Sequence, residues 1–254
     1  MKIVALNASH RGDKGLTRSF LDHIFEGATV AGAECEIITL AKLKINRCLS
    51  CYQCQRGEPR LVCAYNDKDD VRLIFDKMAG ADMLIFATPV YLMNMTGLLK
   101  TLLDRTYSTM DIREGRLSNG LLHHHINPAI SSKPFVTLVV CSNLEDESSK
   151  NVTAYFRTYA RFMEARQVGV LVRNGSGLFD HAANPKLIQD FPKTRDVLAA
   201  YEQSGRELAT LGHIRPATQR RANQEVVPVP FFGILKRLKP IKLQVLDYMQ
   251  REAK

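Results

Sequence analysis

Short apolar runs alternate with segments of helical periodicity along the first 211 residues. Five runs are short, rich in β-branched residues and bounded by small or polar residues, which is typical of strands buried on both faces of a sheet. They are Lys2–Ala8, Cys35–Leu40, Asp82–Thr88, Phe135–Cys141 and Val168–Val172. Strands that alternate with helices predict right-handed β–α–β units and a parallel, doubly wound α/β sheet.

The intervening segments carry apolar residues at the spacing of an amphipathic helix. The predicted helices lie within 17–28, 71–78, 97–107, 152–166 and, beyond Pro192, up to Leu211. Asp67, Asp69 and Asp70 cluster where the second helix should begin, as the helix dipole favours. In the predicted helix within 97–107, Lys100, Asp104 and Arg105 are expected to be solvated. Ligands bind beyond the carboxyl ends of such strands, so we look for a site after the first, third and fourth strands.

The pattern changes beyond Gly212. Prolines divide this part into short pieces, at Pro216, Pro228, Pro230 and Pro240, and one terminal helix is predicted at Lys242–Arg251. Such a segment is too short and broken for an independent domain. We therefore predict one domain over residues 1–212 and a basic C-terminal extension over residues 213–254, which wraps the core or contacts a partner subunit.

The formal net charge of +9 is concentrated in that extension. Residues 214–254 hold nine Lys or Arg and three Asp or Glu, so they carry +6 of the +9. No nucleic-acid recognition motif accompanies this charge, and we interpret it as a solvated or subunit-contacting surface. The first residues are apolar for too short a stretch to form a signal peptide, and no run is long enough to span a bilayer. A soluble, cytoplasmic protein is expected.

Four residues between the first strand and the first helix have the chemistry of a phosphate site. Ser9 and Thr17 offer hydroxyl donors, Arg11 a charged donor, and Gly15 a close approach to the backbone. They lie where backbone amides and the helix dipole converge on an anion. The dinucleotide motif Gly-x-Gly-x-x-Gly and the Walker pattern are both absent from this position. Capping by Ser9 and Thr17, with Arg11 solvated, is the alternative.

A second candidate centre is a group of cysteines with the spacing Cys48-x2-Cys51-x2-Cys54-x8-Cys63. Without an export signal, such a group suggests a metal, a cluster or redox chemistry before structural disulfides. Four thiolates in one loop suit a [4Fe-4S] cluster or zinc, and thiols that are structural or lie near a bound ligand are the other alternative. Cys35 and Cys141 stand in apolar runs and are interpreted as buried structural thiols.

The histidine run His123–His125 lacks the i, i+4 spacing of a helical metal site. We interpret the segment from Ser108 to Lys133 as a solvated or lid loop that covers a ligand.

Three motifs together resemble the NADPH-dependent FMN reductase and iron–sulfur flavoprotein group of the flavodoxin-like superfamily. They are Leu6–Arg11 with Gly15–Thr17, Cys48–Cys54 through Cys63 to Asp69–Asp70, and Thr88–Tyr91 through Gly97–Lys100 to Asp104–Arg105. The resemblance covers roughly the first 110 residues, in the family's order and spacing. It implies a flavodoxin-like, five-stranded parallel sheet in the order 2-1-3-4-5.

The resemblance also assigns residues. The FMN phosphate loop would consist of Ser9, Arg11, Gly15, Leu16 and Thr17. The segment along the edge of the isoalloxazine ring would consist of Thr88, Pro89, Val90, Tyr91, Leu92, Met93 and Asn94. In the iron–sulfur flavoproteins, a cysteine motif similar to Cys48, Cys51, Cys54 and Cys63 holds a [4Fe-4S] cluster.

The sequence therefore predicts an FMN-dependent oxidoreductase that passes electrons from NAD(P)H through FMN to a quinone, a flavin or another small acceptor. Because the flavin carries the chemistry, no catalytic side chain is named. A homodimer or homotetramer would complete the flavin pocket. One alternative is an iron–sulfur flavoprotein that acts as an electron carrier. The other is a metal-binding regulatory protein on a flavodoxin scaffold.

Overall fold

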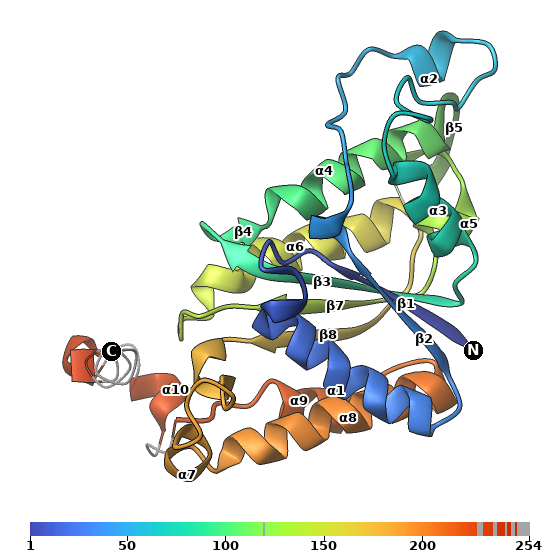
Figure 1. Cartoon of the computed structure of the whole chain (residues 1–254). Coiled ribbons are helices and arrows are strands. Elements are labelled where there is room, and N and C mark those ends of the chain that lie inside the picture. The colour runs from blue at the N-terminus through green and yellow to red at the C-terminus, as the bar shows by residue number, and fades with distance from the viewer. Residues whose placement is uncertain (119, 228–230, 236–237, 242, 245–246, 248–254) are drawn as a thin grey trace.

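The computed structural model describes residues 1–118, 120–227, 231–235, 238–241, 243–244 and 247. Its central feature is a parallel sheet in the order β2-β1-β3-β7-β8 (Figure 1). The strands are β1 (Lys2–Asn7), β2 (Glu34–Thr39), β3 (Met83–Tyr91), β7 (Phe135–Val140) and β8 (Gln167–Arg173). Counted along the chain, these five give the flavodoxin-like order 2-1-3-4-5, so the predicted fold class is confirmed.

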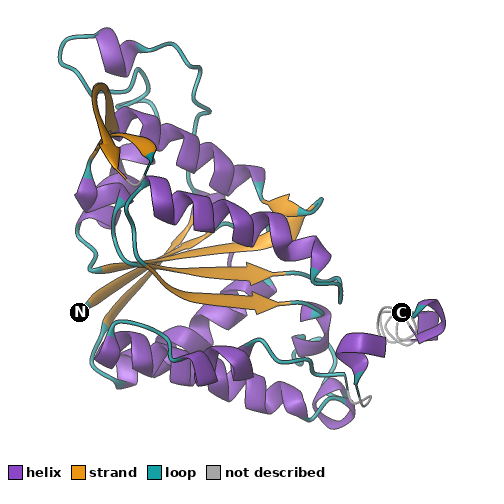
Figure 2. Cartoon of the chain, turned by 180° about the vertical axis from the view of Figure 1, so that it is seen from behind, coloured by secondary structure: helices purple, strands orange, loops and turns teal. Residues whose placement is uncertain are grey.

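Helices cover both faces of the sheet, as the view from behind shows (Figure 2). One layer contains α1 (Leu16–Val30) and α8 (Lys193–Leu211), and the other contains α3 (Val71–Ala79), α4 (Gly97–Arg105) and α6 (Glu147–Phe162). Strand β1 alternates between the two apolar layers: Ile3 and Ala5 face the first, whereas Val4 and Leu6 face the second. Burial on both faces explains its continuous apolar sequence.

Short elements connect this framework. They are the 3-10 turns η1 (Gly12–Lys14), η2 (Leu40–Lys42), η3 (Thr106–Thr109) and η4 (Ser176–Phe179), and the helices α2 (Gln53–Arg56), α5 (Pro128–Ser131), α7 (Leu187–Asp190), α9 (Pro216–Ala222) and α10 (Phe232–Leu235). Strand β4 (Asn94–Met95) pairs with the end of β3. None of the described helices combines the length and the apolar character needed to cross a bilayer.

The prediction of a loop over residues 108–133 is wrong. This segment contains an antiparallel hairpin of β5 (Met110–Ser118) and β6 (Leu121–Ile126). Most of the side chains of β5 are solvent-exposed, so the strand lacks the apolar alternation by which a half-buried strand is recognised. The histidine run lies in β6, where the side chain of His123 is buried and that of His125 is exposed.

Helix α9 closes the β8 edge of the sheet. The side-chain oxygens of Gln219 and Asn223 accept hydrogen bonds from the backbone amides of Val170 and Val172, at 2.7 and 2.8 Å. Asn223 Nδ2 also donates to the Val170 carbonyl, at 2.9 Å. These side chains take the place of a neighbouring strand and protect an otherwise open edge.

The domain boundary at Gly212 stays a prediction, and the predicted helix Lys242–Arg251 falls mostly outside the described residues.

Helices α1 and α8 pack with their backbones in close contact. A Cβ atom added to Gly27 would lie 1.8 Å from the carbonyl oxygen of Glu202, and one added to Gly205 would lie 1.8 Å from that of Ile24. Glycine at both positions is therefore what permits this helix pair.

Gly27→Ala and Gly205→Ala should each lower the free energy of unfolding by roughly 1–3 kcal/mol, because the methyl group forces α1 and α8 apart. In an open helix the same change would stabilise the protein by about 0.5–1 kcal/mol. Calorimetry should detect a fall in Tm of about 2–4 °C per kcal/mol. Gly80→Ala is the matched control, because its Cβ would make only ordinary contact, at 3.6 Å. Equal stability of Gly27→Ala and Gly80→Ala would contradict the close approach.

Candidate functional site

The loop after β1 is shaped by the buried side chain of Asn7. Its Oδ1 accepts from the amide of Ser9 and its Nδ2 donates to the carbonyl of Gly12, both at 3.2 Å. The amide of Gly12 in turn donates to the Ser9 carbonyl, at 2.9 Å, and Gly12 has a φ of +58° that favours glycine. One side chain therefore folds the loop back toward the start of α1.

The loop brings the predicted phosphate-binding residues to the amino terminus of α1. Ser9 and Thr17 are buried, Leu16 packs against the core and Arg11 is exposed. Helix α1 begins after Gly15 without a side-chain cap, so its first amides face no capping oxygen. A Cβ on Gly15 would lie 2.6 Å from Ser9 Oγ, so only glycine fits there. This donor set suits a phosphate monoester.

Asp13 anchors the same loop to the end of β2. Its carboxylate accepts a hydrogen bond from Thr39 Oγ1, at 2.6 Å, and pairs with Lys42 and with Arg18. The hydrogen bonds from Lys42 and Thr39 lower the pKa of Asp13 to about 2. The sequence interpretation missed this residue, because its partners are distant in sequence.

The second predicted segment, Thr88–Asn94, forms the end of β3 and the tight turn into β4. Tyr91 pairs with Asn94, and between them Leu92 and Met93 have φ values of +47° and +61°. Two consecutive left-handed residues give the turn that suits a two-residue hairpin, although side chains other than Asn and Gly rarely adopt it. The side chain of Leu92 is 93% exposed. Asn151 Nδ2 donates a hydrogen bond to the Met93 carbonyl, at 3.1 Å.

The structure brings these two predicted segments together. Thr96 Oγ1 donates to the Ala8 carbonyl at 3.0 Å, and the Thr96 amide donates to Thr88 Oγ1 at 3.1 Å. The rings of His10 and Tyr91 stack with their centroids 5.6 Å apart. In Figure 1 the dark-blue loop after β1 lies beside β4. One site at the carboxyl edge of the sheet therefore contains both segments.

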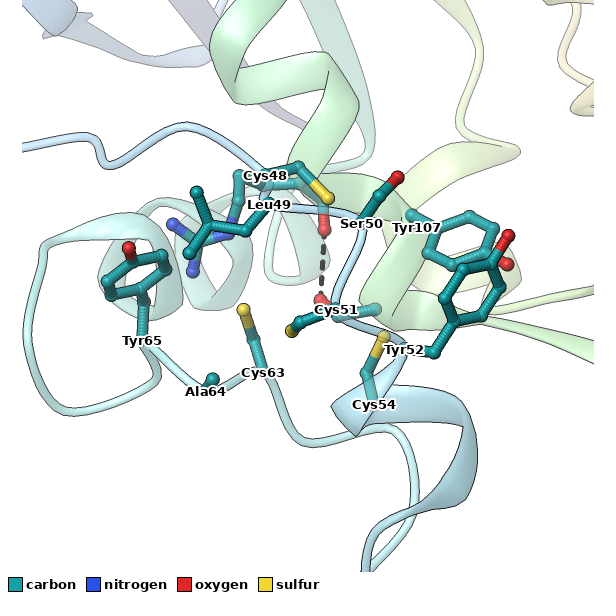
Figure 3. A pocket seen from close by; sticks show the side chains of 12 residues that line it. Cys48, Leu49, Ser50, Cys51, Tyr52, Cys54, Cys63, Ala64, Tyr65 and Tyr107 are labelled. Atoms are coloured by element: carbon teal, nitrogen blue, oxygen red, sulfur yellow. Dashed lines mark hydrogen bonds between the residues drawn. The ribbon is translucent and has the colours of Figure 1, made fainter.

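All four cysteines of the predicted centre line one cavity. Figure 3 shows the side chains of Cys48, Cys51, Cys54 and Cys63 directed toward a common space. Tyr52, Tyr65, Tyr107 and Arg105 are also among the residues that line it. Burial raises the pKa of the Cys54 thiol above its ordinary value.

The sulfur atoms are spread more widely than a zinc site requires. Zn–S bonds of about 2.3 Å in a tetrahedron place the sulfurs roughly 3.8 Å apart. Among the described residues, no three cysteines have their sulfur atoms within 4.8 Å of one another. A [4Fe-4S] cluster takes one thiolate on each iron and so accepts a wider set. The donor set fits such a cluster better than it fits a single zinc ion.

Side chains that are not candidate ligands fix the cysteine loop against the β5–β6 hairpin. The buried Gln55 donates from Nε2 to the carbonyls of Tyr107 and Met110, at 3.2 and 2.8 Å, and accepts from the amide of Ile112. Arg60 forms an ion pair with Asp111. The loop is thus held by contacts to a hairpin that was not predicted, so no sequence pattern indicates the role of Gln55.

The prediction that Arg105 is solvated is wrong. Its side chain is 2% exposed and pairs with the buried side chain of Asp69. Arg105 also donates to the Asn46 carbonyl, at 2.9 Å, and lies over the ring of Tyr65. Burial alone would lower the pKa of Arg105, but its hydrogen bond with Asp69 and its electrostatic attraction to Cys63 raise that pKa above the ordinary value. The fold of the cysteine loop over the end of α4 covers this side chain.

Comparison with known proteins agrees with this geometry. Residues 1–124 match the family model of the NADPH-dependent FMN reductases. The resemblance inferred from the motifs is thereby confirmed, and all three predicted segments lie inside the matched range.

Curated relatives of this chain carry the name iron–sulfur flavoprotein. One from Archaeoglobus fulgidus is 34% identical over 133 residues, 52% of this chain and 59% of the relative. One from Methanocaldococcus jannaschii is 39% identical over 74 residues, 29% of this chain and 35% of the relative. The chain therefore covers less than two thirds of the length of either relative.

Solved structures share the fold at low sequence identity. An FMN-dependent NADH-azoreductase from Bacillus anthracis, in complex with FMN, has a TM-score of 0.58 at 14% identity, over 83% of this chain and 100% of that one. An NAD(P)H:quinone oxidoreductase from Methanothermobacter marburgensis has a TM-score of 0.54 at 17% identity, over 82% and 98%. At this identity the similarity establishes the fold and nothing further.

Proposed function

We propose that the chain is an FMN-dependent oxidoreductase that takes electrons from NAD(P)H and passes them to a small acceptor such as a quinone or a flavin. The observation that carries the proposal is the contact between the phosphate-type loop at Ser9–Thr17 and the strained turn at Thr88–Asn94. The match of residues 1–124 to the FMN reductases supports the same ligand.

In this proposal the chain binds and orients the flavin. Ser9 and Thr17 donate hydroxyl hydrogen bonds to the phosphate, Arg11 adds a charged donor, and the first amides of α1 add the positive end of the helix dipole. The backbone of Thr88–Asn94 hydrogen-bonds the edge of the ring. When bound, FMN supplies the hydride-transfer chemistry. The exposed Tyr91, Leu92 and Met93 would meet a partner subunit in a homodimer or homotetramer that completes the pocket.

Purified protein reconstituted with FMN should lose its flavin absorption band when NADPH or NADH is added without oxygen, and regain it when a quinone follows. A flavin that dithionite bleaches but neither nicotinamide does would overturn the reductase proposal in favour of an electron carrier. A colourless protein that does not retain FMN would contradict both and favour the metal-binding regulatory alternative.

Arg11→Ala should weaken FMN retention by roughly 1–3 kcal/mol, the contribution of a charge-assisted hydrogen bond. Fluorescence titration of free FMN measures the change, because bound flavin is distinguished from free flavin. Arg72→Ala is the control, since Arg72 is an exposed arginine on α3 that pairs with Asp67 away from the loop. If the two variants bind FMN equally well, the phosphate-loop assignment fails.

A second function, electron transfer through a [4Fe-4S] cluster, is favoured by the cavity that contains the four cysteines. The two candidate centres lie at opposite ends of α4. Thr96, which precedes the first residue of α4, contacts Ala8 after β1. Arg105, the last residue of α4, lines the cavity formed by Cys48, Cys51, Cys54 and Cys63, which we call the thiol cavity. Nine residues rise about 1.5 Å each, which separates the two ends by roughly 13 Å. In this function the four cysteines would hold the cluster, which would supply electron transfer to or from the flavin.

Anaerobic reconstitution with iron and sulfide should give about four of each per chain, as a [4Fe-4S] cluster requires. Cys63→Ser should lower both values, whereas Cys35→Ser should leave them unchanged, because Cys35 lies in β2. Zinc bound in place of iron, or equal loss of iron in both variants, would show that the four cysteines do not hold a cluster.

A further inference from the structure

The thiol cavity contains a buried positive charge. Arg105 is among the residues that line the cavity, where its guanidinium group interacts with Cys63, and its side chain is 2% exposed. Its partner Asp69 is fully buried but is not among the residues that line the cavity, and the carboxylate oxygens of Asp69 also accept hydrogen bonds from the amides of Asn46 and Val71. The ion pair is therefore oriented, with its positive member at the cavity wall.

One donor of this guanidinium group has no partner. Arg105 Nε is buried and makes no hydrogen bond in the described structure. The nitrogen Nη1, by contrast, bonds both to Asp69 and to the Asn46 carbonyl. A buried charged N–H without an acceptor is costly, so Nε is suited to an additional anionic acceptor.

Two sources of negative charge lie close to Arg105. Arg105 is the last residue of α4, and Tyr107 and Ser108 of the following turn line the same cavity. The carboxyl end of a helix carries a partial negative charge, which disfavours an anion nearby. Four thiolates around a metal centre add further negative charge. A cation at this point offsets both.

We infer that Arg105 is the charge-compensating residue of the thiol cavity: it favours a metal centre of net negative charge there and raises the reduction potential of that centre. The inference rests on the proposed cluster. One added electron makes such a centre more negative, and a buried cation stabilises the reduced form more than the oxidised form. Asp69 acts as a positioning residue that holds the guanidinium group at the wall.

The test is a potentiometric titration of the reconstituted full chain, followed by the absorbance of the cluster. In Arg105→Met we expect the ratio of reduced to oxidised cluster, at a fixed potential, to fall at least tenfold. This is a shift of about 59 mV to lower potential for a one-electron couple. Arg105→Lys, which keeps the charge, should lie closer to the wild type.

Two further variants make the result decisive. Arg105→Met leaves Asp69 buried without its partner, so the double variant Arg105→Met/Asp69→Asn is titrated as well and should shift in the same direction. Arg72→Met removes an exposed arginine of α3 that pairs with Asp67, and Arg72 does not line the cavity. Its potential should equal that of the wild type.

The outcomes separate the two proposals. Wild-type protein that takes up no iron and sulfide overturns the metal centre and the inference with it. A wild-type cluster whose potential is the same in Arg105→Met and in the double variant overturns the role of Arg105 and leaves the metal centre intact. An equal shift in Arg72→Met would show that loss of any nearby positive charge produces the effect, and would also overturn that role.

Discussion

The hydrogen bond from Thr96 Oγ1 to the Ala8 carbonyl determines how both candidate centres are arranged. The same oxygen accepts from the amide of Leu99 and so caps α4. This side chain ties the end of β1 to the start of α4, and the last residue of α4 lines the thiol cavity. The loop after β1 and the thiol cavity are therefore connected through one helix, although residues from distant parts of the sequence build them.

The fold was predictable because its framework is buried on both faces. Strands β1, β3 and β7 must be apolar throughout, since helices cover both sides of the sheet, and a continuous apolar run is visible in a single sequence. The position of the loop after β1 was predictable for a related reason. The chain between a buried strand and its helix lies at the ligand-binding edge, so Ser9 and Thr17 could be placed without tertiary information.

What the sequence did not disclose depends on contacts between distant segments. Arg105 has the helical position of a solvated residue, and only the fold of residues 43–70 over the end of α4 buries it with Asp69. Gln55 is likewise an ordinary polar residue until β5 lies beside it. Strand β5 itself is mostly exposed, so its pairing with β6, and not a pattern of apolar residues, defines it. Local periodicity cannot report any of these contacts.

These contacts also determine how the thiol cavity can work. The loop contains left-handed residues at Ser50 and Tyr52, a conformation that costs free energy and persists only where the surroundings enforce it. Gln55 and the Arg60–Asp111 ion pair provide that enforcement from the hairpin side, so the cysteines are positioned by groups other than a metal. A site organised in this way pays less ordering entropy when a ligand binds, and its spacing can discriminate between ligands. Under the proposed cluster function, the wide separation of the sulfur atoms would favour a polynuclear centre over a single ion.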